Sequence, residues 1–509
     1  MNWVLSTLLF LPPFVGVFHL LVAGSIRGSI RGRRILRIRI RRIAPGSLKR
    51  IALFWSFFSL IGTIILWLSL DQEGGLTPLM KIDWIEGPDK ILPIIMGGPL
   101  VFAVDGISIY FLILTAFIVP CSILISWNSI KYLVKSFLIC MLVLEFLLYA
   151  VFSVLDIFWF YILFEGVLIP MYLILGIWGS REEKMQAAYY FFFYTLIGSV
   201  IMLLCLFSLY NIHGTTDYLT LVSSNYIVPE NLQERLFLGI FLAMAVKIPI
   251  FPFHIWLPKA HVEAPVAGSV LLAGILLKLG GYGLVRLSWP ILPLGAQNLA
   301  PAIIAMGIIG IVYGSFGTCR QIDVKRLVAY SSVAHMGLAS ITLVTHDIIG
   351  LTGSIFIMLA HGIVSSLLFI LVTILYDRHH TRLIKYYRGL SISMPIWATI
   401  MIMTSLANIA APPSSGFVGE YLSILSSFNW NPMVGVFVCS GVILSAVYSF
   451  YFANRITFGV PGNLLTFSRD VNRREFYITA SMVLLAFFAG VCPAFILEVI
   501  QNSLFFFAL

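Results

Sequence analysis

Long apolar segments follow one another along almost the whole chain. We count fourteen, at approximately residues 3–24, 51–70, 106–126, 134–153, 157–178, 187–211, 235–256, 264–288, 298–318, 327–345, 348–376, 393–428, 431–454 and 475–500. A helix needs about 20 predominantly apolar residues to cross a bilayer, and 60% of all residues are apolar while only 11% are charged. The sequence therefore predicts an all-α polytopic membrane protein with about fourteen transmembrane helices.

The positive charge lies mainly in the short loops that follow odd-numbered segments. These loops hold 26 of the 32 lysines and arginines, three lie in loops on the other face, and three (Lys247, Lys278 and Arg286) lie within segments. Because basic loops stay on the inner side of a membrane, both termini and the acidic loop 71–105 are predicted on the outer side. The net charge of +10 thus reflects topology and does not indicate nucleic-acid binding.

Residues 27–50 are the most basic loop, with ten lysines and arginines. One interpretation is a solvated loop on the inner side. The other is a contact with anionic lipid head groups, where each arginine near the surface contributes about 1 kcal/mol.

The six cysteines are single, and no CxxC pair, GxGxxG fingerprint or P-loop occurs. Neither a zinc site nor an iron–sulfur cluster has its usual ligand spacing, and no nucleotide motif is present. We therefore expect no nucleotide, metal or redox cofactor in this chain.

The stretch 244–286 holds two lysines in apolar surroundings, Lys247 and Lys278. A charge at the bilayer centre costs about 2.5–3.5 kcal/mol even on insertion scales. Pro249 and Pro252 follow the first lysine, and each proline lacks an N–H and crowds the carbonyl four residues before it. A buried amine beside a broken helix is how transporters form ion sites at mid-membrane.

A second break is predicted in segment 393–428, at Pro412 and Pro413, with Glu420 nearby. Interrupted segments in corresponding positions of two halves indicate inverted repeats with a transport path between them.

Other ionisable residues fall within the apolar segments. The candidates for a proton-transfer file are Glu165, Lys247, Lys278, His335, His361 and Glu420, with Glu145 and His254 as second-tier candidates; for His254 and His261, near Pro258 and Pro265, a structural role is favoured. Burial moves the pKa of lysine down and that of glutamate up, toward neutral pH, where both exchange protons. Histidine already titrates there. The residues alone thus predict a Glu–Lys–Lys–His–Glu proton relay.

Four sequence blocks carry a family resemblance: FPFHIWLPKAHVEAPVAGSVLLAGILLKLGGYG, DVKRLVAYSSVAHMG, LAHGIVSSLLF and SSGFVGEYL. They resemble the antiporter-like, proton-pumping subunits of respiratory complex I, over roughly residues 105–475. The resemblance implies two inverted five-helix repeats, with the seventh and twelfth helices broken. We place them at 134–288 and 298–454, with an N-terminal part (1–105), a third helix (106–133) and a C-terminal helix (475–509).

The resemblance also implies roles for individual residues. Glu165 and Lys247 match the family's glutamate–lysine pair, and Lys278 matches its central lysine. His335 and His361 match the relay histidines, and Glu420 matches the terminal carboxylate. Chains 2 and 5 of the complex, and multisubunit sodium/proton antiporters, usually carry lysine at the last position. The segment APPSSG departs from the family pattern because Pro413 replaces a usual glycine.

The family implies partners and a location. Expected partners are other membrane-arm subunits, with chains 2 and 5 as neighbours, and lipids, including cardiolipin at the loop 27–50. NAD, FMN, iron–sulfur clusters and ubiquinone are expected in partner subunits. The loops RQIDVKR and YDRHHTRL resemble those of mitochondrial chains of plants or green algae. This predicts the mitochondrial inner membrane, with basic loops in the matrix and both termini on the intermembrane side.

Two other functions fit the same residues. The chain is alternatively a subunit of a multisubunit cation/proton antiporter, which sodium-dependent exchange without NADH would reveal. A membrane scaffold is the third interpretation, but it does not explain buried charges at helix breaks.

Overall fold

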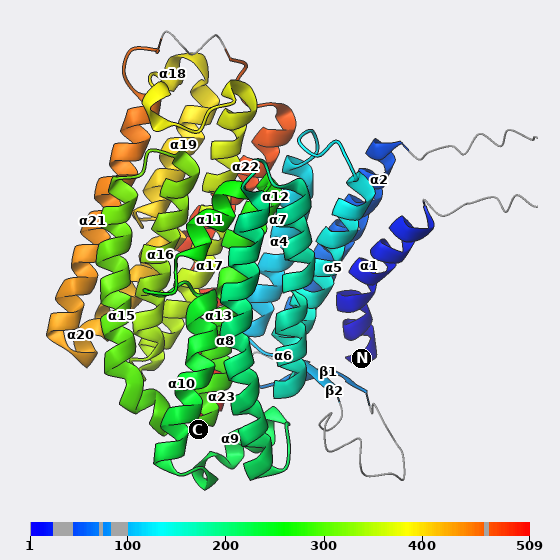
Figure 1. Cartoon of the computed structure of the whole chain (residues 1–509), viewed down its shortest axis with the longest axis vertical. Coiled ribbons are helices and arrows are strands. Elements are labelled where there is room, and N and C mark those ends of the chain that lie inside the picture. Colours follow the sequence, from blue (N-terminus) through cyan, green and yellow to red (C-terminus); the bar gives the residue numbers. More distant parts are fainter. Residues whose placement is uncertain (1, 24–43, 71–74, 83–99, 463–467, 509) are drawn as a thin grey trace, which may run out of the picture.

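The computed structural model describes residues 2–23, 44–70, 75–82, 100–462 and 468–508. The described chain forms a bundle of long helices that run roughly along one axis (Figure 1). The α-helices are α1 (Asn2–Val22), α2 (Pro45–Leu68), α4 (Ser108–Ile125), α5 (Val134–Ser153), α6 (Ile157–Gly166), α7 (Leu168–Trp178), α8 (Lys184–His213), α9 (Tyr218–Ser223), α10 (Glu230–Lys247), α11 (Trp256–Glu263), α12 (Val266–Leu271), α13 (Leu277–Gly283), α14 (Trp289–Ile291), α15 (Pro293–Cys319), α16 (Val324–Leu343), α17 (Ile348–His379), α18 (Leu390–Ser393), α19 (Pro395–Asn408), α20 (Ser415–Trp430), α21 (Pro432–Thr457), α22 (Arg473–Val491) and α23 (Ala494–Ala508).

The structure differs from the predicted segments in three places. The last predicted helix is two helices, because α22 ends at Val491 and α23 starts after Pro493. A small antiparallel sheet, β1 (Thr77–Ile82) with β2 (Leu100–Val104), lies in the acidic loop. Asp105 follows β2 and forms an ion pair with Arg286, at 2.6 Å, so a charge of that loop is buried in the bundle.

Eleven helical stretches of the described chain are long and apolar enough to cross a membrane. The predicted segments outside these eleven are 235–256, 327–345 and 393–428. The first overlaps α10, which carries the charged residues Glu230, Glu234, Arg235 and Lys247. The second overlaps α16, which is interrupted by Lys325, Arg326 and His335. The third is divided into α19 and α20, of 14 and 16 residues. The count of fourteen thus includes helices that are polar or interrupted.

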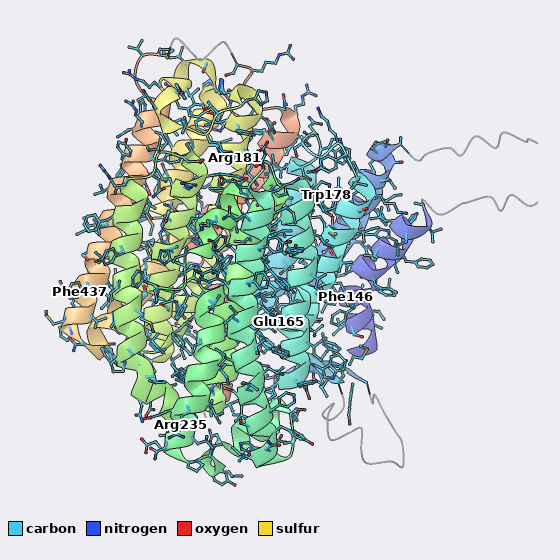
Figure 2. All side chains as sticks on the ribbon, viewed as in Figure 1. Phe146, Glu165, Trp178, Arg181, Arg235 and Phe437 are labelled. Carbon is cyan, nitrogen blue, oxygen red and sulfur yellow. The ribbon has the colours of Figure 1, made fainter. Side chains whose placement is uncertain are left out.

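The two ends of the bundle differ in what they carry. Both termini and the β1–β2 hairpin lie toward one end, and α18 lies at the other (Figure 1). Glu165 lies between these ends, whereas Arg181 and Arg235 lie toward opposite ends (Figure 2). The arginine-rich residues 27–43 lie outside the described residues, so the predicted lipid contact there has no structural counterpart, and residues 45–50 open α2.

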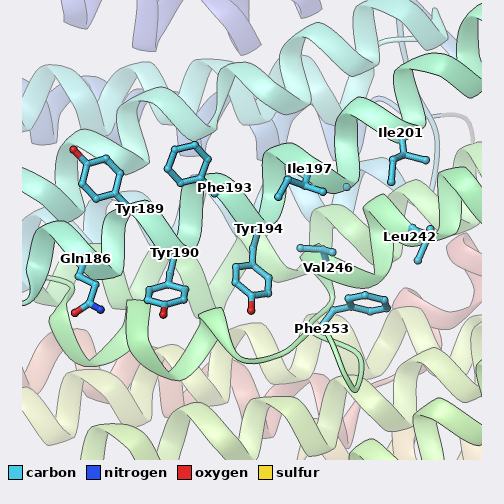
Figure 3. A pocket seen from close by; sticks show the side chains of 11 residues that line it. Gln186, Tyr189, Tyr190, Phe193, Tyr194, Ile197, Ile201, Leu242, Val246 and Phe253 are labelled. Carbon is cyan, nitrogen blue, oxygen red and sulfur yellow. The ribbon is translucent and has the colours of Figure 1, made fainter.

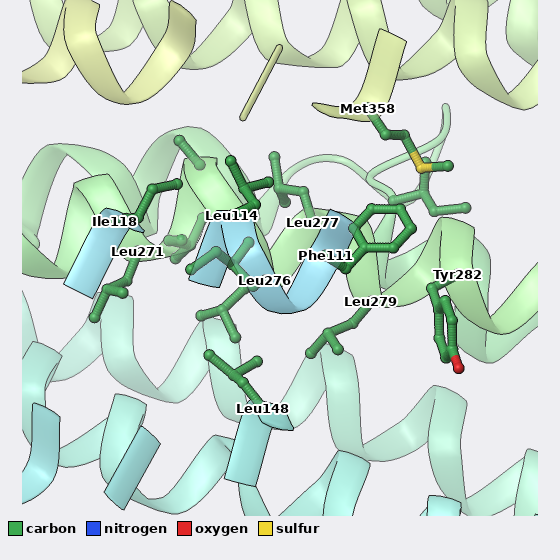
Figure 4. Close-up of a cluster of buried hydrophobic side chains, with 14 of the residues drawn as sticks. Phe111, Leu114, Ile118, Leu148, Leu271, Leu276, Leu277, Leu279, Tyr282 and Met358 are labelled. Atoms are coloured by element: carbon green, nitrogen blue, oxygen red, sulfur yellow. The ribbon is translucent and has the colours of Figure 1, made fainter. Parts of the chain in front are cut away.

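The centre of the bundle is an apolar core around α13. Leu277 and Leu279 pack there together with Leu148 of α5 and Phe111 of α4 (Figure 4). The Tyr282 hydroxyl donates a hydrogen bond of 2.9 Å to the Phe152 carbonyl. Lys278 lies between the two leucines in sequence and is completely buried, so its ammonium needs partners inside the protein.

Candidate functional site: a buried file of charged groups between two broken helices

The first helix break follows Lys247, the last residue of α10. The Ile248 amide still donates to the carbonyl four residues back, that of Met244, at 2.8 Å. The Ile250 amide instead donates five residues back, to Ala245, at 3.0 Å. The helix therefore ends in one widened turn, and the chain resumes as α11.

The second break follows Asn408, the last residue of α19, and has the same hydrogen bonds. The Ile409 amide donates to Ser405 at 3.0 Å, and the Ala411 amide donates to Leu406 at 3.0 Å. Again the first bond spans four residues and the second spans five. The chain resumes as α20, which carries Glu420.

These bonds place the two breaks in register with each other. Lys247 occupies the position that Asn408 occupies in the second break. Each break also contains a cis X–Pro bond, at Phe251–Pro252 and at Pro412–Pro413. The predicted breaks are thus both present, and Pro413 is compatible with a break like the first.

Lys278 is positioned by a π-helical turn. The segment Leu272–Leu276 is π-helical and leads directly into α13; such turns in a helix often mark functional sites. The Lys278 ammonium donates to the Ala273 carbonyl, and its Nζ lies 2.8 Å from Nδ1 of His361 on α17. The structure thus joins two of the predicted relay residues directly.

The file continues from His361 to Glu420. The rings of His361 and His335, which lies on α16, have centroids 5.7 Å apart. Nδ1 of His335 lies 3.5 Å from Oε1 of Glu420, and its Nε2 lies 3.2 Å from the Tyr448 hydroxyl of α21. Four predicted residues therefore form one continuous group, to which the term file refers from here on: Lys278, His361, His335 and Glu420.

A cavity of about 20 Å³ lies between these side chains, lined by His335, His361, Asn408 and Glu420 among others. Nε2 of His361 and Oε2 of Glu420 are buried and have no hydrogen-bond partner among the described residues. A cavity needs about 10–15 Å³ to hold one water molecule, which also needs two to four polar partners. The space thus has the size and the polar lining for a single bridging water.

Glu165 and Lys247 lie near each other but are not in direct contact. They interact electrostatically, yet no direct ion pair joins them in the described part of the chain. Phe164, the residue before Glu165, places its ring centroid 4.5 Å from Nζ of Lys247. Oε1 of Glu165 has no hydrogen-bond partner among the described side chains, and Ser199 of α8 is its other polar neighbour. The predicted pair is separated in this structure.

The second-tier candidates lie outside these contacts. Oε1 of Glu145 accepts hydrogen bonds from the hydroxyls of Ser59 and Tyr149, the latter at 2.9 Å. His254 lies in the first break, where its ring stacks on Phe251 with centroids 5.6 Å apart. The contacts of Glu145 and His254 are thus of the kind expected for structural residues.

Two residues extend the file toward the end that carries α18: His261, for which the sequence favoured a structural role, and Lys325, which the sequence analysis did not single out. His261 is fully buried and stacks on Phe369, with centroids 4.5 Å apart. It interacts electrostatically with both Lys278 and Lys325, and neither of its ring nitrogens has a hydrogen-bond partner among the described residues. The His and Lys residue types were visible in the sequence, but the proximity that links them was not.

Lys325 borders a cavity of about 650 Å³, whose lining also includes Lys131, Arg378, Arg382 and Glu475. Its Nζ donates to the Ala264 carbonyl at 2.8 Å. Because cationic side chains and the Glu475 carboxylate line it, this cavity is polar. It therefore reaches from the basic loops to the beginning of the buried file.

A second large cavity, of about 510 Å³, has a different character. Tyr189, Phe193, Ile197 and Val246 lie along its wall, which belongs to α8, α10 and the first break (Figure 3). The lining is almost wholly apolar, and none of the file residues contributes to it. The described residues also contain no cluster of histidine, cysteine and carboxylate side chains suited to a metal ion.

Comparisons with known proteins identify the family of this chain. A family model described as NADH:quinone oxidoreductase/Mrp antiporter, TM, matches residues 154–445. NADH-ubiquinone oxidoreductase chain 4 of Metridium senile is 54% identical over 469 residues, which cover 92% of this chain and 94% of that relative. The relative of the same name from Prototheca wickerhamii is 44% identical and covers 90% of this chain and 89% of its own.

One solved structure matches almost the whole fold. It belongs to respiratory complex I from Thermus thermophilus with bound NADH, with a TM-score of 0.84, 26% identity and coverage of 98% of this chain and 99% of that one. The extent and identity of these matches show that the chain belongs to the NADH-ubiquinone oxidoreductase chain 4 family of antiporter-like membrane proteins.

Proposed function

We propose that protons cross this chain along the buried file, through Lys278, His361, His335 and Glu420. As a member of the chain 4 family, the chain is a proton-pumping membrane-arm subunit of NADH:ubiquinone oxidoreductase. Electron transfer and the groups that perform it (NAD, FMN, iron–sulfur clusters and ubiquinone) belong to partner subunits. This chain supplies groups that hold and pass protons.

Proton uptake begins at the polar cavity beside Lys325. From there the route passes His261 and reaches the Lys278 ammonium. Lys278 transfers its proton to Nδ1 of His361, the atom 2.8 Å away. The small cavity beside His361 admits one water, which carries the proton onward to His335 and Glu420.

The Glu165–Lys247 pair controls this transfer. With the carboxylate close, the lysine keeps its proton; when the two groups separate, the ammonium loses its stabilising partner and releases its proton into the file. Each charge moved against the membrane potential costs about 2.3 kcal/mol per 100 mV. Two unit charges 4 Å apart interact by about 4 kcal/mol at an effective dielectric constant of 20, so one such separation supplies energy of the required size.

The observation that carries this proposal is the contact of Lys278 with His361. Lys278 meets a histidine as well as the Ala273 carbonyl, so a donor lies next to an acceptor, whereas a purely structural lysine would be expected to end only on carbonyls or carboxylates. Lys49 is such a lysine: it is also buried, and its Nζ donates to the carbonyls of Trp127 and Ile130, at 2.5 and 3.3 Å.

The test compares Lys278→Met with Lys49→Met in the assembled complex. Protons pumped per NADH oxidised are measured in sealed membrane vesicles, beside the NADH oxidation rate and the amount of complex on a native gel. We expect Lys278→Met to lower the pumped ratio, because it removes a proton carrier. Lys49→Met should change only the amount of complex. If Lys278→Met leaves the ratio of protons pumped per NADH unchanged, the proposed proton route through Lys278 is excluded.

The alternative function, that of a subunit of a multisubunit cation/proton antiporter, is supported by the fold alone. The chain resembles one in the Mrp complex of Dietzia sp., with a TM-score of 0.81 and coverage of 97% of this chain and 52% of that one, but at 18% identity. Sodium-dependent proton exchange by vesicles without NADH would support it.

We further propose the surroundings of the chain. Chains 2 and 5 of the complex are its neighbours in the membrane arm, and anionic lipid, including cardiolipin, contacts the loop 27–50. The location is the mitochondrial inner membrane, with the basic loops in the matrix and the termini in the intermembrane space. The matching hydrogen bonds of the two breaks support the assignment of 134–288 and 298–454 as inverted repeats.

A further inference from the structure

Tyr448 is a buried polar residue to which the proposed relay assigns no role. It lies on α21 and is 1% exposed. Its hydroxyl lies 3.2 Å from Nε2 of His335, on the side of the ring opposite to Glu420. We propose that Tyr448 is a positioning residue, which keeps Nδ1–H of His335 directed at Glu420 and Nε2 ready to receive the incoming proton. This inference rests on the proposed function.

The two neighbours of His335 decide where its proton resides. A carboxylate only accepts hydrogen bonds, and Oε1 of Glu420 lies 3.5 Å from Nδ1, at ion-pair distance, so the proposal places the hydrogen of the neutral ring on Nδ1. A neutral imidazole then has a bare Nε2, which must accept. Tyr448 is the group within reach of that nitrogen, and its O–H donates. The arrangement therefore favours one tautomer, the one needed before transfer.

The same hydroxyl serves the later states of the ring. For the proton delivered by the bridging water to reach Nε2, the Tyr448 O–H first rotates away and frees the lone pair of Nε2. The water then gives up its proton, the ring becomes imidazolium, and the Tyr448 oxygen accepts from Nε2–H. The Nδ1–H proton then passes to Oε1 of Glu420: the N–H bond breaks and an O–H bond forms. The neutral ring left behind donates from Nε2 to Tyr448 and accepts at Nδ1 from Glu420. A hydroxyl is suited to this position because it both donates and accepts.

Asn408 holds Tyr448 in this place. Its side chain interacts with the Tyr448 hydroxyl, and its Nδ2 donates to Ser449 at 2.9 Å. Asn408 is the residue in register with Lys247, at the end of the helix before the break. A second cavity of about 20 Å³ borders His335, Glu420 and Tyr448, so the hydroxyl has room to rotate.

The test is Tyr448→Phe in the assembled complex, with Tyr451→Phe as the matched control. Both tyrosines lie on α21, but Tyr451 is 51% exposed. Phenylalanine retains the ring and removes only the hydroxyl. We expect NADH oxidation to continue while proton transfer through this chain slows roughly two- to tenfold, the factor that corresponds to one lost hydrogen bond, so that fewer protons are pumped per NADH. Tyr451→Phe should leave the ratio unchanged.

A spectroscopic readout separates positioning from a general structural effect. Infrared spectra of the complex with isotope-labelled histidine distinguish the two imidazole tautomers, and the bands of His335 are identified by their loss in His335→Gln. We expect the Nδ1–H signature in the unmodified chain and a mixture of tautomers in Tyr448→Phe. An unchanged pumped ratio overturns the inference, and so does a reduced ratio with the Nδ1–H signature intact.

A second variant covers failure of Tyr448→Phe to assemble. Asn408→Ala keeps the tyrosine but removes its amide neighbour, so a smaller fall in the ratio and partial mixing of tautomers are expected. No change in either quantity would overturn the inference. Lys278→Met separates failure of the proposed function from failure of the role of Tyr448. If Lys278→Met pumps normally, the proposed function fails. If Lys278→Met loses pumping while Tyr448→Phe pumps normally, only the role of Tyr448 is refuted.

Discussion

The two helix breaks share a backbone and differ in how their charges meet. After α10, Lys247 and Glu165 interact without a direct ion pair, and the Phe164 ring lies against the ammonium. After α19, the position of Lys247 is taken by the neutral Asn408, and Glu420 lies 3.5 Å from His335. The same local geometry thus holds separated charges in one half and, in the other, titratable groups in closer contact, which we propose as proton carriers.

This difference suggests a division of labour. A charge interaction weakens with separation and depends strongly on the local dielectric, so a pair that is not in contact responds to small movements. A proton relay instead needs donor and acceptor within hydrogen-bond reach or one water apart. The first break is therefore suited to respond to a signal, and the second is suited to conduct.

The largest effect is expected for Glu420→Gln, in the conducting half. Glutamine keeps the size of the side chain but cannot take up the proton from His335, and proton-transfer groups contribute typically about 10²–10⁴-fold to a rate. The rate of proton transfer through this chain should fall roughly tenfold or more, seen as fewer protons pumped per NADH in vesicles with equal amounts of complex. Glu234→Gln is the control, since Glu234 contacts Asn298 in an exposed position. Full pumping by Glu420→Gln would remove this residue from the file.

An intermediate effect is expected for Glu165→Gln, in the responsive half. The variant removes the charge that acts on Lys247 but leaves the lysine itself, so pumping should fall less than in Glu420→Gln. Lys247→Met removes the ammonium as well and should cost more than Glu165→Gln. The measurement is again the pumped ratio, now at several imposed membrane potentials. Equal losses in the two variants would show that the pair acts as one unit, and full pumping by Lys247→Met would exclude its role.

Much of the fold and of the file could be predicted because charge is rare inside a membrane. Lys278, His361, His335 and Glu420 were identified as candidates from their apolar surroundings, and the structure places them side by side. The proline pairs predicted both breaks correctly. These features could be identified from the sequence because a charge or a freed carbonyl is energetically costly in lipid.

Other parts depend on contacts between distant segments and could not be predicted. Tyr448 is one of 21 tyrosines, and only its distance to His335, 113 residues away in sequence, distinguishes it. His261 stands next to prolines in the sequence, which favoured a structural role. The separation of Glu165 from Lys247 depends on side-chain placement that sequence patterns do not contain.

The smallest effect is expected for Glu145→Gln, which tests whether burial alone makes a carboxylate part of the relay. Glu145 is as buried as Lys278, yet its contacts are the hydroxyls of Ser59 and Tyr149. A glutamine retains Oε1 as an acceptor for both, so stability should change by about 0.5–1.5 kcal/mol at most, and the pumped ratio should stay at the value of the unmodified chain. The amount of assembled complex and the pumped ratio are compared with those of Glu165→Gln. A loss of pumping as large as in Glu165→Gln would place Glu145 in the responsive half, and the contrast between the two breaks would then extend to α5 and α2.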